Sequence, residues 1–177
     1  MIFDVPYIWI SAQLLGNARA QCKLGDLYRA GNGLAKNPKK AICWYRKAAD
    51  QGDYLGLYEL GDCYFEGIGN EISQEQAVLW WRKAAAKGDP LSQYRLSLCY
   101  SEGSGVPKDE IEAYAYLHLP EVLAFGWALL DHNGGRGEQH GSKERAKLES
   151  SMTQTQIAAG LKRAGEIDRE LIEKRRL

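Results

Sequence analysis

The chain has 177 residues, of which 45% are hydrophobic and 26% are charged, a balance typical of a folded globular protein. Lys plus Arg and Asp plus Glu both number 23, so the formal net charge is zero and gives no electrostatic attraction to nucleic acid or to an anionic membrane. We therefore expect neither as a partner. The sequence contains no run of 18 apolar residues, which argues against a membrane-spanning helix.

The main feature of the sequence is a segment that occurs twice, 36 residues apart. Residues 41–52 read Ala-Ile-Cys-Trp-Tyr-Arg-Lys-Ala-Ala-Asp-Gln-Gly, and residues 77–88 read Ala-Val-Leu-Trp-Trp-Arg-Lys-Ala-Ala-Ala-Lys-Gly. A weaker copy begins at Ala113. Self-similarity at such a period is typical of stacked repeats. We therefore predict an all-α solenoid of about three helix pairs, each made of an A helix followed by a B helix.

Residues 1–17 are predicted to be the second half of a repeat. Trp9, Ala12 and Gly16 each stand 36 residues before a matching position of the first complete repeat. We expect a B helix from Ile8 to Leu15 that covers the apolar side of the next repeat, because the ends of a repeat array need such a cover.

Complete repeats are expected at residues 18–53 and 54–89, and a divergent third repeat at 90–120. The first A helix should run from Arg19 to Ala30. Gly25 lies inside it, and Gly61 holds the same position in the second repeat, although glycine inside a helix costs up to about 1 kcal/mol relative to alanine. A glycine repeated at this position indicates that a neighbouring helix approaches closely there. The third repeat has Ser97, which is still small.

Glycines and capping residues mark the helix ends at the same period. Glycine supplies a left-handed C-cap to each A helix, and Asn, Ser and Asp are strong N-cap residues for each B helix. A phosphate-binding glycine loop is the functional alternative, but no Gly-Lys-Ser/Thr and no preceding strand pattern accompany these glycines. The glycines are Gly31, Gly33, Gly67, Gly69, Gly103 and Gly105, and the N-cap residues are Asn37, Ser73 and Asp109.

The B helices are rich in aromatic residues. Trp44, Tyr45, Trp80 and Trp81 lie at helical spacing between small alanines. A ligand-binding aromatic cage is one interpretation. Packing in the core is the interpretation that we favour, because aromatic residues at this spacing usually fill cores.

Four cysteines occur, and no two stand at the Cys-x-x-Cys spacing of a zinc or redox motif. Cys63 and Cys99 hold the same position in successive repeats. Packed helices lie about 8–10 Å apart, which is too far for a disulfide between these two. Spacing does not exclude a bridge between Cys22 and Cys43. We expect four reduced and mostly buried thiols.

Proline ends the third repeat. Pro120 stands where the B helix would continue, and proline inside a helix costs about 3 kcal/mol, so this helix should end near Leu119. Residues 121–177 are expected to form capping helices, the first over 121–134, followed by a glycine-rich loop at 133–141. Asp131, His132, Glu138 and His140 could ligate a metal, but we favour a solvated loop and expect no metal.

The final helix is expected from about Thr153 to Arg175. An apolar stripe along it should cover the end of the last repeats, with coiled-coil dimerisation as the alternative. The stripe consists of Ile157, Leu161, Ala164, Ile167 and Leu171.

The pattern Leu-Gly-x-x-Tyr-x-x-Gly-x-Gly, followed by Ala-x-x-Trp-Tyr/Trp-Arg-Lys-Ala-Ala-x-x-Gly, resembles the Sel-one-like repeat (SLR) family, a branch of the tetratricopeptide-like α-solenoids. The resemblance covers about residues 6–119 and implies a right-handed α/α superhelix. The chain length leads us to expect one domain. A secreted branch of the family carries cysteines where this chain has Ala49 and Leu57, which implies a reduced protein here. We expect a cytoplasmic location, or a periplasmic or secreted one if a leader has been removed. The matching residues are Leu24, Gly25, Tyr28, Gly31, Gly33, Ala41, Trp44, Tyr45, Ala48, Ala49 and Gly52, then Leu60, Gly61, Tyr64, Gly67, Gly69, Ala77, Trp80, Trp81, Ala84, Ala85 and Gly88.

No catalytic motif occurs, so we expect neither an enzyme nor a cofactor. The resemblance implies a non-enzymatic interaction module, many of which are bacterial adaptors or regulators. We expect a partner protein or peptide on a concave face lined by solvent-facing A-helix residues. An immunity or inhibitor protein against a toxin enzyme and a self-associating scaffold are the alternatives, and the chain should be a monomer or weak homodimer. The face consists of Arg19, Lys23, Asp26, Leu55, Glu59, Asp62, Leu91, Arg95 and Leu98.

Overall fold

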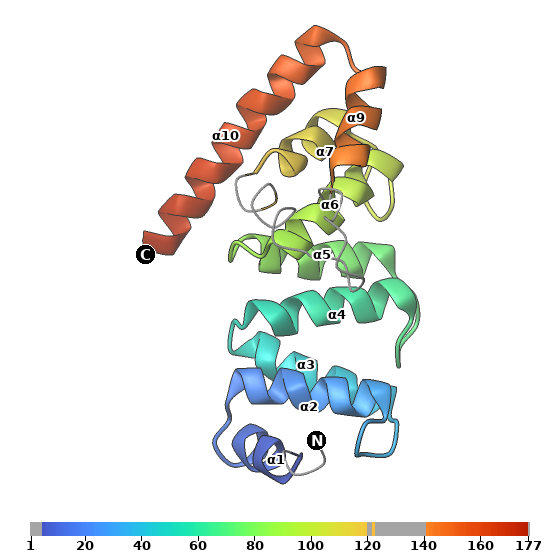
Figure 1. Cartoon of the computed structure of the whole chain (residues 1–177), viewed down its shortest axis with the longest axis vertical. Helices are drawn as coiled ribbons and strands as arrows, with labels where there is room; N and C mark the ends of the chain where they lie inside the picture. The colour runs from blue at the N-terminus through green and yellow to red at the C-terminus, as the bar shows by residue number, and fades with distance from the viewer. Residues whose placement is uncertain (1–4, 120–121, 123–140, 177) are drawn as a thin grey trace, which may run out of the picture. The chain divides into compact units, whose positions relative to one another are not determined.

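The computed structural model of the chain describes residues 5–119, 122 and 141–176 (Figure 1). These residues form helices and connecting loops without any strand, which confirms the all-α prediction. The chain divides into two compact units, Met1–Ala84 and Ala85–Leu177. The helix predicted over 121–134 and the four candidate metal ligands of the glycine-rich loop lie outside the described residues, Val122 apart.

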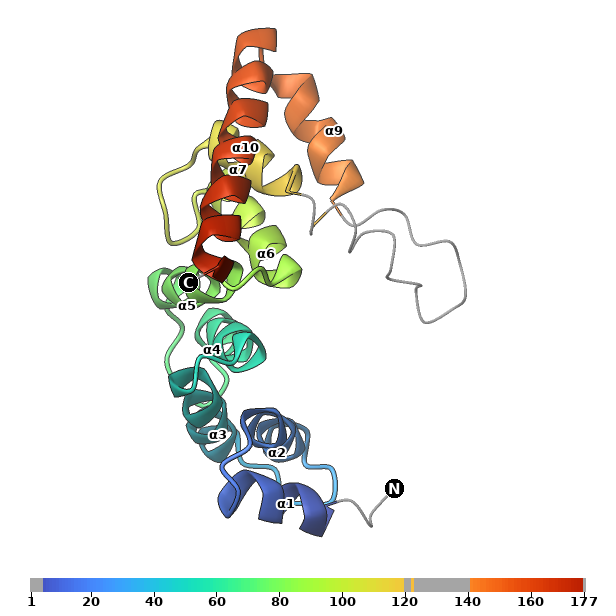
Figure 2. The same cartoon turned by 90° about the vertical axis from the view of Figure 1, so that its left-hand side faces the viewer.

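Unit 1 begins with a single helix and continues with two helix pairs. Helix α1 packs on α2, and α3 packs on both α2 and α4. The A helices α2 and α4 lie on one side of this unit and α3 on the other (Figure 2). The predicted half-repeat is present, although its helix begins and ends earlier than expected. The helices are α1 (Val5–Gln13), α2 (Ala18–Ala30), α3 (Pro38–Asp50), α4 (Tyr54–Glu66) and α5 (Gln74–Ala85), whose last residue is the first of unit 2.

Unit 2 contains the third repeat and the C-terminal helices. Helix α7 packs on α6, and both α9 and α10 pack on α7. Helix α7 ends at Leu117, which confirms that the third B helix ends before Pro120. Sequence reasoning did not identify α9, whose one buried residue is Leu148. The helices are α6 (Pro90–Glu102), α7 (Glu110–Leu117), α9 (Ser142–Ser151) and α10 (Gln154–Arg176).

Side-chain caps begin the helices of every repeat. The predicted B-helix cap Asn37 accepts a hydrogen bond from the backbone N–H of Lys40 at 3.0 Å, and Ser73 and Asp109 cap their helices in the same way. A second series, not predicted, caps the A helices at the same period. It consists of Asn17, Asp53 and Asp89.

The repeated glycine inside the A helix receives an aromatic ring from the following B helix. A Cβ atom on Gly25 would lie 2.5 Å from Cε1 of Tyr45, and one on Gly61 would overlap the indole of Trp81. Both rings are completely buried. The predicted close approach is therefore confirmed, and its cause is an aromatic side chain that needs a neighbour without a Cβ.

Helix α10 buries a stripe that differs from the predicted one at one position. Ala164, Ile167 and Leu171 are buried against the end of the third repeat, but Leu161 is 49% exposed. Gly160 takes its place, because a Cβ there would lie 2.8 Å from the ring of Tyr114. The close approach of α10 to α7 at this glycine turns Leu161 toward solvent.

All four cysteines are free. Cys22, Cys63 and Cys99 are buried, whereas Cys43 is exposed. Burial raises the pKa of the Cys63 thiol to about 12, so it packs as a small neutral group.

We predict that Gly61→Ser lowers the free energy of unfolding by about 2 kcal/mol, because the new side chain overlaps the buried Trp81 ring. Trp81→Leu alone should also destabilise the protein, since it leaves a cavity. The double variant should lose less than the sum of the two, because it reproduces the Ser97–Leu117 pair of the third repeat. Urea unfolding of the three variants measures this coupling.

Gly165→Ala is the matched control, since Gly165 lies inside α10 and a Cβ there would have no atom of a neighbouring element within 4 Å. It should leave the stability unchanged or raise it by up to about 1 kcal/mol. Strict additivity of the two substitutions at Gly61 and Trp81 would contradict the proposed fit.

Candidate functional site

The nine residues of the predicted face lie on the A helices. Unit 1 contains the first six, on α2 and α4, which contact each other directly. Unit 2 contains the other three, on α6. The residues on α2 are Arg19, Lys23 and Asp26, those on α4 are Leu55, Glu59 and Asp62, and those on α6 are Leu91, Arg95 and Leu98.

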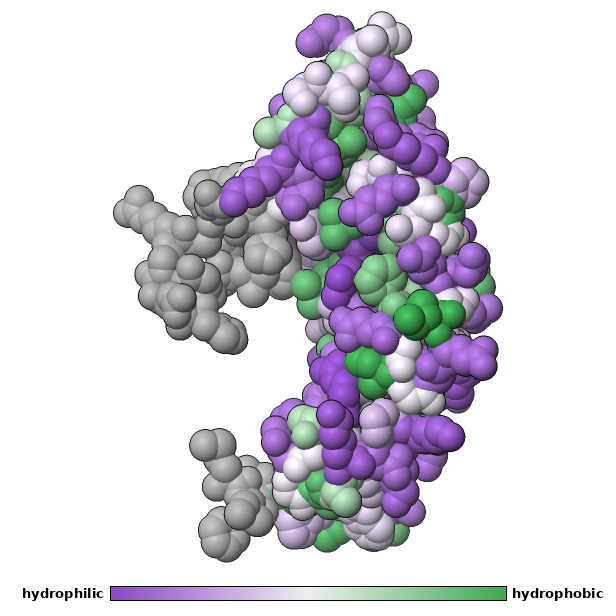
Figure 3. Space-filling view, turned by 90° about the vertical axis from the view of Figure 1, so that its right-hand side faces the viewer, coloured by the Kyte–Doolittle hydropathy of each residue, from purple (hydrophilic) through white to green (hydrophobic). Residues whose placement is uncertain are grey.

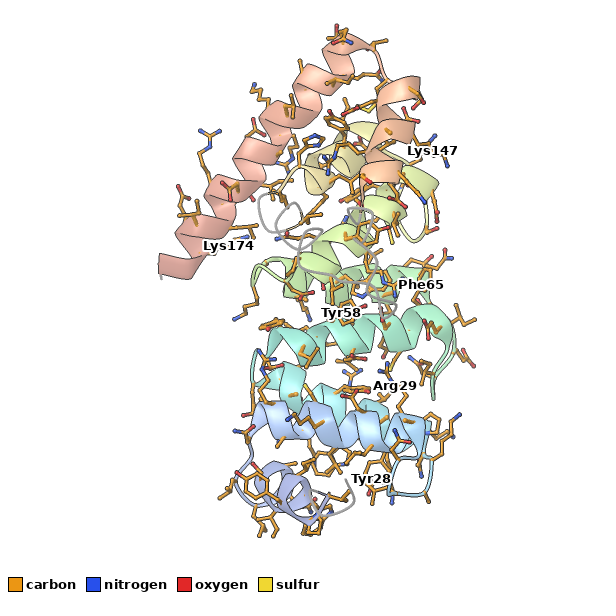
Figure 4. The ribbon with its side chains drawn as sticks, viewed as in Figure 1. Tyr28, Arg29, Tyr58, Phe65, Lys147 and Lys174 are labelled. Carbon is orange, nitrogen blue, oxygen red and sulfur yellow. The ribbon has the colours of Figure 1, made fainter. Side chains whose placement is uncertain are left out.

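An ion pair joins the two A helices of unit 1. Arg29 Nη1 of α2 lies 2.7 Å from Glu59 Oε2 of α4, and its Nη2 lies 3.6 Å from Asp26 Oδ1. Arg29 extends between these helices (Figure 4). The hydroxyl of Tyr45 donates a hydrogen bond to the same Asp26 oxygen at 2.7 Å. These contacts hold the carboxylates of Asp26 and Glu59 in position.

Glu59 and Asp62 are buried, so the prediction that they face solvent was wrong. Their exposed fractions are 9% and 8%. The neighbouring A helix covers this part of α4, and Arg29 reaches over Glu59 from it. Burial raises the pKa of Glu59 to about 7, and the nearby Asp26 and Asp62 act in the same direction while Arg29 opposes them.

The other four predicted residues of unit 1 remain accessible to different extents. Arg19 and Lys23 are exposed, and Asp26 and Leu55 are half-buried. Arg19 is held in place, because its Nε lies 3.0 Å from Asp53 Oδ2 and its guanidinium lies over the Tyr54 ring. This part of the face offers two cations and an aliphatic side chain.

The three predicted residues of unit 2, Leu91, Arg95 and Leu98, are all half-buried. Leu98 lines a cavity of about 580 Å³ between α6, α7 and α9. Sequence reasoning missed this cavity because one of its walls is α9, which carries no strong apolar pattern.

The aromatic residues of the B helices form core and not a cage. Trp44, Tyr45 and Trp81 are buried, and Trp80 is half-buried. Lys83 Nζ lies 4.0 Å from the centre of the Trp80 ring and therefore covers its outer face. The packing interpretation is confirmed.

Among residues 5–119, 122 and 141–176, no three or more His, Cys, Asp or Glu side chains are grouped so that they could hold a metal ion. In the same residues, every helix is too short or too polar to cross a bilayer. On the face shown in Figure 3, hydrophilic side chains surround several separate apolar areas.

We predict that Glu59 makes the stability fall as the pH rises between about 4.5 and 7. The folded protein binds a proton more tightly at Glu59 than the unfolded chain does, so ionisation of Glu59 above pH 7 disfavours folding. Relative to Glu59→Gln, the wild type should lose on the order of 2 kcal/mol between pH 5 and pH 7.5. Urea unfolding at both pH values measures the difference.

Glu66→Gln is the control, because Glu66 is an exposed residue of the same helix. The pH-dependent difference from the wild type should be smaller for Glu66→Gln than for Glu59→Gln. A Glu59→Gln protein with the same pH dependence as the wild type would contradict the effect of burial.

Comparison with known proteins places this arrangement among solved repeat structures. A protective antigen of uropathogenic Escherichia coli strains with an SLR fold matches 90% of this chain at 31% identity and a TM-score of 0.68. This chain spans only 31% of the length of that antigen. A Sel1 repeat protein from Oxalobacter formigenes matches 64% of this chain and 86% of its own length, at 34% identity and a TM-score of 0.61.

The family model of the Sel1 repeat matches the chain three times, at residues 18–53, 55–89 and 90–119. The three matches together cover more than half of the sequence and coincide with the helix pairs α2–α3, α4–α5 and α6–α7. The chain therefore belongs to the Sel1 repeat family.

Proposed function

We propose that the chain is a non-enzymatic adaptor or regulator that binds a partner protein or peptide through its A helices. Sel1 repeat proteins generally mediate interactions between proteins, and their repeats form a non-catalytic scaffold. The proposal adds the binding face, to which unit 1 contributes the accessible residues of the predicted set on α2 and α4, namely Arg19, Lys23, Asp26 and Leu55.

One observation supports this face most directly, the contact between α2 and α4. The pair Arg29–Glu59 joins the two helices, and Asp26 also contacts Arg29. The exposed Lys23 and the half-buried Leu55 lie on the same two helices. A fixed surface that combines both charges with aliphatic side chains suits an extended peptide or a helix of another protein. The rigid ion pair also lowers the conformational entropy that binding costs.

The test is site-specific photo-crosslinking, with a photoreactive amino acid at Lys23 on α2. The control position is Lys39, which is also exposed but lies on the B helix α3. In the native cells, crosslinking from Lys23 should yield a discrete partner protein, and crosslinking from Lys39 should yield at least about tenfold less. Equal yields from both positions, or none from either, would contradict binding through the A helices.

Self-association is a second candidate, which one observation favours. Tyr7, Ile10 and Leu14 stand on one side of α1 and just beyond its end, and all three are exposed. Exposed apolar residues that gather on one side of a helix are typical of an interface.

Light scattering over a dilution series tests this candidate. If α1 mediates self-association, Ile10→Glu should abolish the concentration dependence of the mass. Leu79→Glu on α5 is the control, because Leu79 is exposed to nearly the same extent, and it should leave that dependence unchanged. A constant monomer mass of the unaltered protein would exclude self-association.

A further inference from the structure

In the first two repeats, bulky side chains fill the space between the A helix and the B helix near the repeated glycine. The third repeat lacks these side chains. In the first repeat this space holds the ring of Tyr45, and the guanidinium of Arg29, one turn beyond Gly25, lies over that ring at 5.8 Å from its centre. In the second it holds Trp81 and Phe65, whose ring centres lie 5.4 Å apart. Figure 4 shows how Arg29 and Phe65 extend from their A helices. The third repeat has Leu117 and Ser101 at the same positions.

A cavity of about 580 Å³ lies at this position of the third repeat. All its walls belong to unit 2, and they come from α6, the start and end of α7, and α9. Its volume is within the usual range of ligand pockets, about 300–1,000 Å³. The loss of two large side chains thus coincides with a space that a partner can fill.

The inner part of the cavity is apolar. Leu117 and Leu148 are almost fully buried in its wall. Ser97 and Ser101 also line it, but their hydroxyls donate to the backbone carbonyls of Tyr94 and Leu98 at 2.7 and 3.0 Å. These hydroxyls are therefore already used, and the surface between the leucines suits a bulky apolar group.

The rim of the cavity is charged and includes an available cation. Lys108 pairs with Glu110 at 2.8 Å, and Glu144 accepts a hydrogen bond from Tyr94. Lys147 of α9 forms no ion pair with any described residue. Its side chain extends from α9 on the side away from α10 (Figure 4). An acidic group beside the apolar one would meet this ammonium group.

We propose that this cavity binds an aromatic side chain of the partner protein, with an acidic residue next to it that pairs with Lys147. The inference rests on the proposed function and names the anchor of the partner. Buried aromatic anchors contribute most of the affinity in many interfaces. Leu98 lines the cavity and is also one of the three predicted binding residues on α6.

The test uses the peptide acetyl-Asp-Trp-Asp-amide and records ¹⁵N NMR spectra of the full chain during its titration. Shifts should concentrate on Ser97, Leu98, Leu117 and Leu148. The peptide acetyl-Asp-Ala-Asp-amide should bind at least about tenfold more weakly, which corresponds to about 1.4 kcal/mol. Ser101→Phe should abolish binding, because it restores the ring that the second repeat has at this position.

Lys147→Gln should weaken the binding of the tryptophan peptide severalfold without any effect on folding, since Lys147 is exposed. Lys174→Gln is the matched control, because Lys174 is an exposed lysine of α10 outside the cavity (Figure 4). Equal loss in both variants would show that only net charge matters, and it would contradict a role of Lys147.

Shifts that are absent, or that lie away from α6, α7 and α9, would overturn the proposal. The proposed function is tested separately by crosslinking from Lys23. If the partner still crosslinks from Lys23 and binds the Ser101→Phe protein as well as the wild type, the cavity is not a binding site. That result would still support binding through the A helices.

Discussion

The contact between a B-helix aromatic ring and an A-helix glycine determines how the first two repeats pack. Tyr45 lies on Gly25 and Trp81 lies on Gly61, and any Cβ at these glycines would overlap the ring. Burial of the large apolar surface of the ring offsets the energetic cost of glycine inside the helix. The polar end of the Tyr45 ring then fixes Asp26, which also contacts Arg29, so the same contact positions charged groups at the surface.

In the third repeat both members of this contact change together. Ser97 stands where the first two repeats have glycine, and Leu117 stands where they have an aromatic ring. The A-helix side chain is thus larger than in those repeats, and the B-helix side chain is smaller. In unit 2 a glycine and an aromatic ring meet instead at Gly160 of α10, which packs on the Tyr114 ring of α7. The C-terminal helices thus cover the third repeat by the same physical device, and the space left between α6, α7 and α9 remains open.

The sequence was sufficient to predict the repeat period, the N-caps of the B helices and the buried aromatic residues, because each of these depends on local pattern. It was not sufficient to predict that Glu59 and Asp62 are buried, because their burial depends on how the neighbouring A helix approaches α4. The partner Arg29 was missed because its equivalents, Phe65 and Ser101, are of other types and give no repeated signal. Leu161 was misplaced because Gly160 fits the same helical stripe nearly as well and permits a closer approach.

We conclude that the glycine–ring contact fills the first two repeats and that its absence from the third opens the cavity. A crystal structure of the chain with Ser97→Gly, Ser101→Phe and Leu117→Trp tests it most directly. The account predicts that the new indole packs on position 97, that the ring at 101 contacts it, and that the cavity between α6, α7 and α9 disappears. An indole that points into solvent while the cavity persists would contradict it.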